Sequence, residues 1–187
     1  MPASAIATAS QYLTFFLAGE EYGVDILQVT DIIECGAVTK VPGTPPWIRG
    51  VHNLRGAVVP VVDLAMKFGF PPTVVSSRSC IVIAELQVDD EPMVIGIMAD
   101  SVDKVIDLER SEILPPPAFG SRVQISALLG VGRVDDKFVL LLDIDYALTA
   151  SGSLAGGERS GIAIDAAMTP AEVHPVIPAG VGGDRHS

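Results

Sequence analysis

The sequence contains very little cysteine. Its 187 residues include only Cys35 and Cys80, which are too few for a disulfide framework and are not spaced like the paired ligands of a zinc site. Residues 1–10 lack the basic and apolar segments of a secretory signal, and no apolar run approaches the roughly 18 residues of a membrane-spanning helix. We therefore expect a protein of a reducing compartment, the cytoplasm.

Basic residues are also scarce. Twelve Lys and Arg stand against 23 Asp and Glu, which gives a formal net charge of −11. Such a surface repels phosphate backbones and anionic membranes. We therefore expect no nucleic-acid partner and no direct insertion into a membrane.

The sequence lacks the common catalytic and metal-binding motifs. It has no GxxxxGK[ST] phosphate loop, no GxGxxG fingerprint, no HExxH and no GxSxG. His52 is the only histidine of the part expected to fold, and a single histidine is more often structural than catalytic. The acid pairs Asp89-Asp90 and Asp135-Asp136 lie at expected turns, where Asp is favoured without any cation. These absences favour a binding protein without cofactor, metal or catalysis.

The composition divides the chain into three parts. Apolar residues make up 49% of the chain, enough to form a core. Of the last 37 residues, however, 20 are Gly, Pro, Ala or Ser, and none is aromatic. We predict a flexible N-terminus over 1–10, a folded domain over 11–150 and a flexible tail rich in Gly, Ala and Pro over 151–187.

The folded part has the pattern of a mainly β protein. Apolar runs of strand length, most of them rich in Val and Ile, recur between turn-forming clusters. They are Tyr12–Leu17, Tyr22–Ile26, Val51–Leu54, Ala57–Val62, Cys80–Leu86, Met93–Met98, Val102–Leu108, Leu128–Val134 and Lys137–Asp143. Short helices are predicted over Gln28–Glu34, Leu64–Phe68 and Tyr146–Ala150. Within Val24–Glu34 the pattern fits both a helical face and an extended chain, and we favour a strand that passes into a helical turn.

Two sequence shifts indicate an internal duplication. A shift of 80 lays residues 50–64 over residues 130–144, so that Gly50, Val51, Val59 and Asp63 meet identical residues. A shift of 73 lays Gly23 and the apolar residues after it over Gly96 and its successors. Each half then has a strand pair, a loop, and a hairpin that ends on an Asp able to cap a short helix. We predict two small β-barrels packed together, one for each half, since closure removes exposed sheet edges.

The stretch Pro45-Pro46-Trp47-Ile48-Arg49-Gly50-Val51-His52-Asn53-Leu54-Arg55-Gly56-Ala57-Val58-Val59-Pro60-Val61-Val62-Asp63-Leu64 resembles the central signature of the CheW family of bacterial chemotaxis coupling proteins. The resemblance extends over roughly residues 11–150. It implies two packed five-stranded Src-homology-3-like β-barrels with short helices. It also implies a non-catalytic cytoplasmic adaptor between two partners, the regulatory domain of the histidine kinase CheA and the cytoplasmic tips of methyl-accepting chemoreceptors.

The resemblance further implies a receptor groove between the barrels. Arg55 matches the family's hairpin arginine, Val29 and Asp31 match positions on the neighbouring edge, and Asn53 and Gly50 belong to the same motif. A guanidinium at a tight turn offers a planar fork of donors to carboxylates or carbonyls of a partner helix. Each assignment has a structural alternative: a solvated turn for Arg55, a charged outer face for Asp31, and a core position for Val29.

Three further residues have expected structural roles. Trp47 either closes the end of a barrel or anchors a partner, and we favour the first. Pro60 cannot donate a ladder hydrogen bond and so marks an edge or a bulge. Gly56 supplies a positive φ in the turn. Gly50 and Gly130 permit close backbone approach or mark bulges.

Two rivals to the chemotaxis adaptor remain open at the level of sequence. One is an adaptor of the same family in a different chemosensory pathway, such as one driving pilus-based surface motility. The other is a small-ligand-binding β-barrel or an unrecognised hydrolase that uses Asp63, Asp143 or His52.

Overall fold

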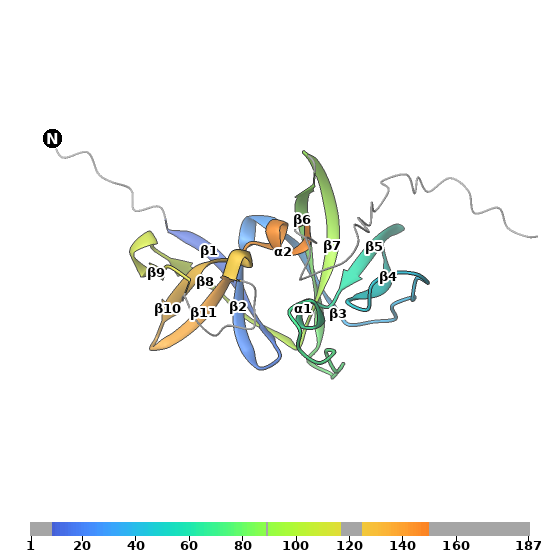
Figure 1. The fold of residues 1–187 in the computed structure, drawn as a ribbon, viewed down its shortest axis with the longest axis horizontal. Coiled ribbons are helices and arrows are strands. Elements are labelled where there is room, and N and C mark those ends of the chain that lie inside the picture. The colour runs from blue at the N-terminus through green and yellow to red at the C-terminus, as the bar shows by residue number, and fades with distance from the viewer. Residues whose placement is uncertain (1–8, 89, 117–124, 150–187) are drawn as a thin grey trace, which may run out of the picture. The chain divides into compact units, whose positions relative to one another are not determined.

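The computed structural model describes residues 9–88, 90–116 and 125–149, which lie in one compact unit, Met1–Leu154. The predicted mainly β class is confirmed (Figure 1). The strands are β1 Ser10–Leu17, β2 Glu20–Asp25, β3 Val29–Glu34, β4 Ile48–Leu54, β5 Ala57–Val62, β6 Cys80–Val88, β7 Glu91–Ala99, β8 Ser101–Leu108, β9 Ile113–Leu114, β10 Leu128–Val134 and β11 Lys137–Leu142. The helices are α1 Leu64–Lys67 and α2 Ile144–Thr149, and three 3-10 turns are η1 Ile26–Gln28, η2 Arg110–Glu112 and η3 Ile125–Ala127. The predicted tail over 151–187 lies outside the described residues.

The helix predicted over Gln28–Glu34 is wrong, because Gln28 ends the 3-10 turn η1 and Val29–Glu34 forms strand β3. Half-buried and exposed residues alternate along β3, which is the two-residue period of a strand. The favoured alternative, a strand that passes into a helical turn, is right for β2 and η1. The short helices expected after Asp63 and Asp143 are present, and both carboxylates accept from a backbone nitrogen of the first turn as predicted.

The strands form two sheets, each of which curls into a half-barrel of the Src-homology-3-like type. Sheet A has the order β8-β1-β2-β11-β10-β9, in which β9 is only two residues long. Sheet B has the order β3-β6-β7-β5-β4. The predicted pair of five-stranded modules is therefore confirmed, with β9 as a short addition to sheet A.

Each sheet combines strands from both halves of the sequence, so the expectation of one barrel for each half is wrong. Strands β1 and β2 of the first half pair with β8 and β11 of the second, while β3 and β5 pair with β6 and β7. The connections explain the exchange. Only Asp100 separates β7 from β8, and a hairpin loop needs about two residues. The chain therefore continues into the other sheet instead of folding back.

The duplication itself is visible in the strand register. In sheet A, Gly23 lies opposite Leu141 in a parallel pairing, and in sheet B Gly96 lies opposite Val61. These are the residues that the shifts of 73 and 80 relate. A Cβ on Gly23 would lie 2.9 Å from the side chain of Leu141, and one on Gly96 would lie 2.6 Å from that of Ile81. At both positions a larger residue would therefore force a neighbouring side chain to shift.

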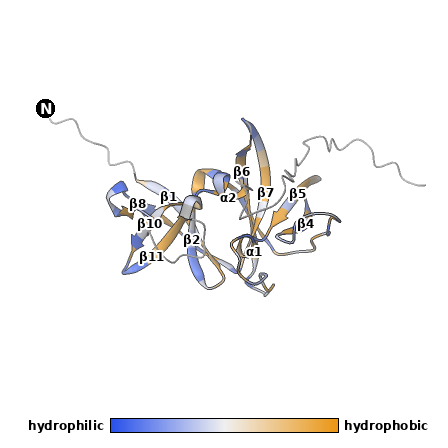
Figure 2. Cartoon of the chain, in the orientation of Figure 1, coloured by the Kyte–Doolittle hydropathy of each residue, from blue (hydrophilic) through white to orange (hydrophobic). Residues whose placement is uncertain are grey.

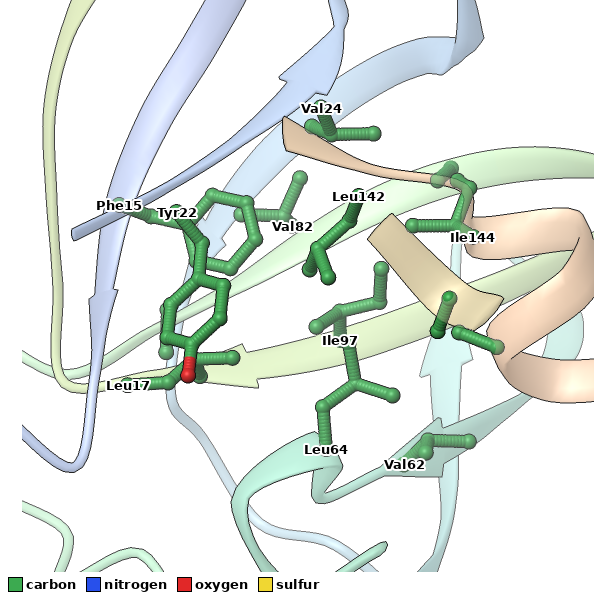
Figure 3. Packing of buried hydrophobic residues seen from close by; sticks show 14 of the residues in the cluster. Phe15, Leu17, Tyr22, Val24, Val62, Leu64, Val82, Ile97, Leu142 and Ile144 are labelled. Carbon is green, nitrogen blue, oxygen red and sulfur yellow. The ribbon is translucent and has the colours of Figure 1, made fainter. Parts of the chain in front are cut away.

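One hydrophobic cluster joins the two sheets. It includes Phe15, Tyr22 and Leu142 of sheet A and Val82 and Ile97 of sheet B (Figure 3). Hydrophobic residues run along β5 and β11, the last strands of the two halves (Figure 2). A smaller cluster lies within each sheet. Burial of apolar surface between the sheets therefore holds the two modules together.

Candidate partner-binding site

The hairpin between β4 and β5 presents Arg55 to solvent. Arg55 and Gly56 form its two-residue loop with φ values of 52° and 89°, the signs that a type I′ turn requires. The side-chain oxygen of Asn53 accepts a hydrogen bond from the backbone nitrogen of Gly56 at 2.8 Å. Gly56 thus has the positive φ expected of it. Asn53 holds the loop closed, and the Arg55 side chain remains 84% exposed.

Arg55 contacts Asp31, which precedes it by 24 residues. Its Nη2 lies 3.1 Å from Oδ2 of Asp31, whose other oxygen accepts from the backbone nitrogen of Ile32 at 2.8 Å. An exposed pair of this kind contributes about 0–1 kcal/mol to stability. The guanidinium forms no second hydrogen bond within the described residues. The pair therefore orients Arg55 and leaves most of its donors available to a partner.

Val29 lies at the start of the same edge strand. It pairs with Ala84, and its half-buried side chain packs against the cluster between the sheets. The register shifts between Val29 and Asp31, so this strand end has a bulge. Val29 is thus partly a core residue, as the structural alternative proposed, and part of it remains accessible beside Asp31.

Gly50 lies in the interior of the hairpin and is buried. A Cβ on it would lie 2.1 Å from the carbonyl oxygen of Thr39, and its φ is 139°. Thr39 and Val51 exchange two backbone hydrogen bonds of 2.9 and 2.8 Å beside it. Gly50 therefore permits a close backbone approach, and its register shift in β4 shows that it also marks a bulge.

Gly130 has the same role in sheet A. A Cβ there would lie 2.6 Å from Ile113 and 2.8 Å from the carbonyl oxygen of Leu114, and the pairing of β10 with β11 shifts register beside it. Both glycines named from the sequence thus combine the two expected functions, close approach and bulge.

Trp47 and Pro60 have mainly structural surroundings. Trp47 is half-buried against the cluster between the sheets, and the ammonium of Lys67 lies 4.1 Å from the centre of its ring. Pro60 lies opposite Val51, and the parallel pairing of β5 with β7 begins only at the next residue, Val61. Pro60, which has no N–H to donate, thus lies just before the paired residues of β5, as expected for a local edge.

Sequence reasoning missed the network around Asp63. Its fully buried carboxylate lies 3.2 Å from Nη1 of Arg49 and accepts hydrogen bonds from the backbone nitrogen and hydroxyl of Thr73, both at 2.9 Å. It also caps α1. The sequence indicates only this cap, because Thr73 lies in a loop without a recognisable pattern.

Each residue named for a rival catalytic site makes a hydrogen bond that supports the local fold. Nδ1 of His52 lies 3.2 Å from the carbonyl oxygen of Ala37, and Asp143 caps α2. Asp135 and Asp136 have positive φ values of 44° and 63°, which places them in a hairpin turn. Asp90 also has positive φ, and Asp89 lies outside the described residues.

The two thiols have the properties of structural cysteines. Burial raises the pKa of both Cys35 and Cys80 above the ordinary thiol value. A raised pKa lowers the fraction of reactive thiolate near neutral pH. Neither residue therefore resembles an activated nucleophile.

Within the described part of the chain, we find no helix long and apolar enough to span a bilayer.

Fold and site together define a class of protein: a mainly β protein built from two Src-homology-3-like modules, with an exposed arginine at the turn of one hairpin. The family model described as a CheW-like domain matches residues 11–151. The chain therefore belongs to the CheW-like family.

Individual relatives agree with this assignment. The chain is 34% identical over 140 residues to chemotaxis protein CheW of Klebsiella aerogenes, with 75% of this chain and 82% of that protein covered. It is 29% identical over 121 residues to protein FrzA of Myxococcus xanthus, with 65% and 72% covered. Among solved structures it resembles scaffolding protein TtCheW from Thermoanaerobacter tengcongensis, with a TM-score of 0.69, 29% identity and coverage of 82% of this chain and 96% of that one.

Proposed function

We propose that this protein is a non-catalytic cytoplasmic adaptor that couples chemoreceptors to the histidine kinase CheA in signalling arrays. Membership of the CheW-like family supports this proposal, as does the word "scaffolding" in the name of a structural relative. The engagement of Asp63, Asp143 and His52 in structural hydrogen bonds supports the absence of catalysis.

The observation that carries the receptor assignment is the geometry of Arg55. A type I′ turn and the Asp31 carboxylate hold an exposed guanidinium, and Asp31 follows the half-buried Val29 by two residues on strand β3. A receptor hairpin has helices with carboxylates, carbonyls and apolar side chains. The guanidinium can bind the first two through paired hydrogen bonds, and Val29 can pack against the third.

We propose that the kinase binds a surface other than the one around Arg55. In this family the kinase's regulatory domain resembles the adaptor, so the two can associate by contacts between barrels. An interface of ordinary size, about 800 Å² for each partner, leaves room on the two sheets for both partners.

The decisive experiment is the substitution Arg55→Glu in a reconstituted array of receptor, kinase and this protein. Because the ion pair is exposed, the free energy of unfolding should change by only about 1 kcal/mol. Receptor-dependent kinase activation should nevertheless fall. Arg133→Glu is the matched control, since Arg133 is an exposed arginine of the sister hairpin with its own pair, 3.5 Å from Asp136. Equal loss of activation in both variants, or loss of folding with binding intact, would contradict the proposal.

A second candidate, which the sequence leaves open, is an adaptor of the same family for another chemosensory array; one relative, protein FrzA of Myxococcus xanthus, has a name other than CheW. The same fold serves both candidates, so only the partners separate them. Co-purification from the native organism, followed by identification of the recovered receptors and kinase, assigns the pathway. Recovery of receptors and kinase from a pathway other than flagellar chemotaxis would favour the second candidate.

A further inference from the structure

Asp145, in the first turn of α2, accepts hydrogen bonds from residues of two other elements. Its Oδ2 accepts a hydrogen bond from Nε2 of Gln28 in η1 at 2.9 Å. Its Oδ1 accepts one from the backbone nitrogen of Gln87 in β6 at 2.8 Å. Helix α2 follows the last strand of sheet A, whereas β6 belongs to sheet B. One carboxylate thus links sheet A, sheet B and the crossover between them.

The backbone around Asp145 is fixed by burial. Ile144 and Ala147 of the same helix are buried in the cluster between the sheets, and Asp143 caps the helix. Because each oxygen of Asp145 has a different partner, the carboxylate is held in one orientation. Hydrogen bonds to an ionised acceptor are stronger than those between neutral groups.

Gln28 occupies the point at which the partner-binding edge begins. It is the last residue of η1, and the next residue, Val29, is the first of β3 and donates its backbone N–H to the carbonyl of Ile26. Among the described strands, β3 lies at the edge of sheet B and pairs with β6 alone, and its register shifts between Val29 and Asp31. The start of β3 is therefore held by a bulged pairing with β6 and by a bond of 3.3 Å from the Thr30 hydroxyl to the carbonyl of Ile83. The Gln28 side chain supplies an additional attachment on the side of sheet A.

Among the described residues, no side chain makes such a link at the related crossover in the other half of the chain. Strand β7 passes into β8 through Asp100 alone, whose backbone nitrogen donates to the carbonyl of Phe16 at 2.9 Å. The shift of 80 relates Asp145 to Ala65, which has no carboxylate. The link is therefore not a general requirement of the fold, and it is found at the crossover that leads to Val29 and Asp31.

We infer that Asp145 is a positioning residue for partner binding: through Gln28 it fixes the start of β3 and so sets Val29 and Asp31 in register with Arg55. This inference rests on the proposed function. It adds a residue 90 positions after Arg55 to the determinants of receptor affinity, although Asp145 need not touch the receptor.

The link can be tested first in the protein alone. Gln28→Met removes the donor and keeps a side chain of similar length, whereas Gln28→Lys retains a donor. Gln11→Met is the matched control, because Gln11 donates instead to Asp107 of β8, at 2.8 Å, within sheet A. Hydrogen exchange of the Val29 amide should quicken about fivefold in Gln28→Met, the effect of losing one hydrogen bond, and should stay near wild type in the other two. Unchanged exchange in Gln28→Met would overturn the inference.

The second measurement is affinity for a soluble fragment of a chemoreceptor cytoplasmic tip. Gln28→Met and Asp145→Ala should each weaken binding about fivefold, while Gln11→Met and Gln28→Lys should bind as wild type. Wild-type affinity in Gln28→Met despite faster exchange would overturn the positioning role and leave the proposed function standing. If the wild-type protein itself fails to bind the fragment, the proposed receptor function fails, while the exchange result still reports whether the link exists.

Discussion

Asp63 and Thr73 are joined by two hydrogen bonds of 2.9 Å, since the carboxylate accepts from both the backbone nitrogen and the hydroxyl of the threonine. With Arg49 and the first turn of α1 as further partners, the carboxylate is buried yet fully satisfied. The carboxylate of Asp63 therefore attaches the loop after α1 to the core. Removing one of the bonded partners should destabilise the fold.

Asp63→Ala should lower the free energy of unfolding by about 3–5 kcal/mol, because the buried Thr73 and the partly exposed guanidinium of Arg49 lose their common partner. The matched control is Asp143→Ala. Asp143 is the counterpart of Asp63 in the second half, but among the described residues its side chain only caps α2, so its loss should cost about 1 kcal/mol. Urea denaturation measures both values. Equal costs would show that the network around Asp63 adds little to the cap.

Gly50→Ala should destabilise the protein by roughly 2–4 kcal/mol, because the new Cβ meets the backbone of Thr39 and its φ is unfavourable for alanine. Gly56→Ala is the control. It also has positive φ, but a Cβ there has open space, so about 1 kcal/mol is expected. Thermal melting of both variants tests this difference. Similar losses would mean that strain, and not the contact with Thr39, makes glycine necessary at position 50.

Tyr22→Phe should leave stability unchanged or raise it by about 1–2 kcal/mol. The Tyr22 hydroxyl is buried between the sheets and has no hydrogen-bond partner within the described residues (Figure 3). Its removal therefore avoids the cost of burying an unpaired polar group. Chemical denaturation measures the change. A clear loss of stability would show that the hydroxyl has a partner, such as a bound water.

Tyr22 should also contribute to alkaline unfolding. Burial raises the pKa of Tyr22 to about 12, above its ordinary value of 10.0. The folded state thus keeps the proton that the unfolded state releases, so the contribution of this group is complete below pH 10 and is lost as the pH rises through about 12. Stability should fall less steeply in Tyr22→Phe over this range. An identical slope would contradict the assignment.

Exchanging the charges of the Arg55 pair separates stability from binding. The double variant Asp31→Arg with Arg55→Asp restores an ion pair between the same two positions. Its free energy of unfolding should therefore remain within about 1 kcal/mol of that of the wild type. Receptor-dependent kinase activation should nevertheless stay low, because the exposed cation no longer lies on the turn. Recovery of activation would show that the pair acts through its attraction alone.

The sequence by itself determined most of the secondary-structure elements and the correspondence between the two halves. Alternating and continuous apolar runs predicted most strands, Asp63 and Asp143 predicted two short capped helices, and the shifts of 73 and 80 predicted equivalent positions in the two halves. These features follow from local periodicity and turn chemistry, which a sequence contains directly. The family signature around Arg55 was likewise readable without coordinates.

Only the tertiary structure decided which strands share a sheet and which side chains meet. Most of the helix predicted over Gln28–Glu34, residues Val29–Glu34, is strand β3, because pairing with β6 overrides a local pattern that fits both states. The exchange of strands between the halves, the contact of Arg55 with Asp31 and the link from Asp145 to Gln28 join residues 24 or more positions apart. Contacts of this kind depend on how the sheets close on each other, and no local sequence period records that.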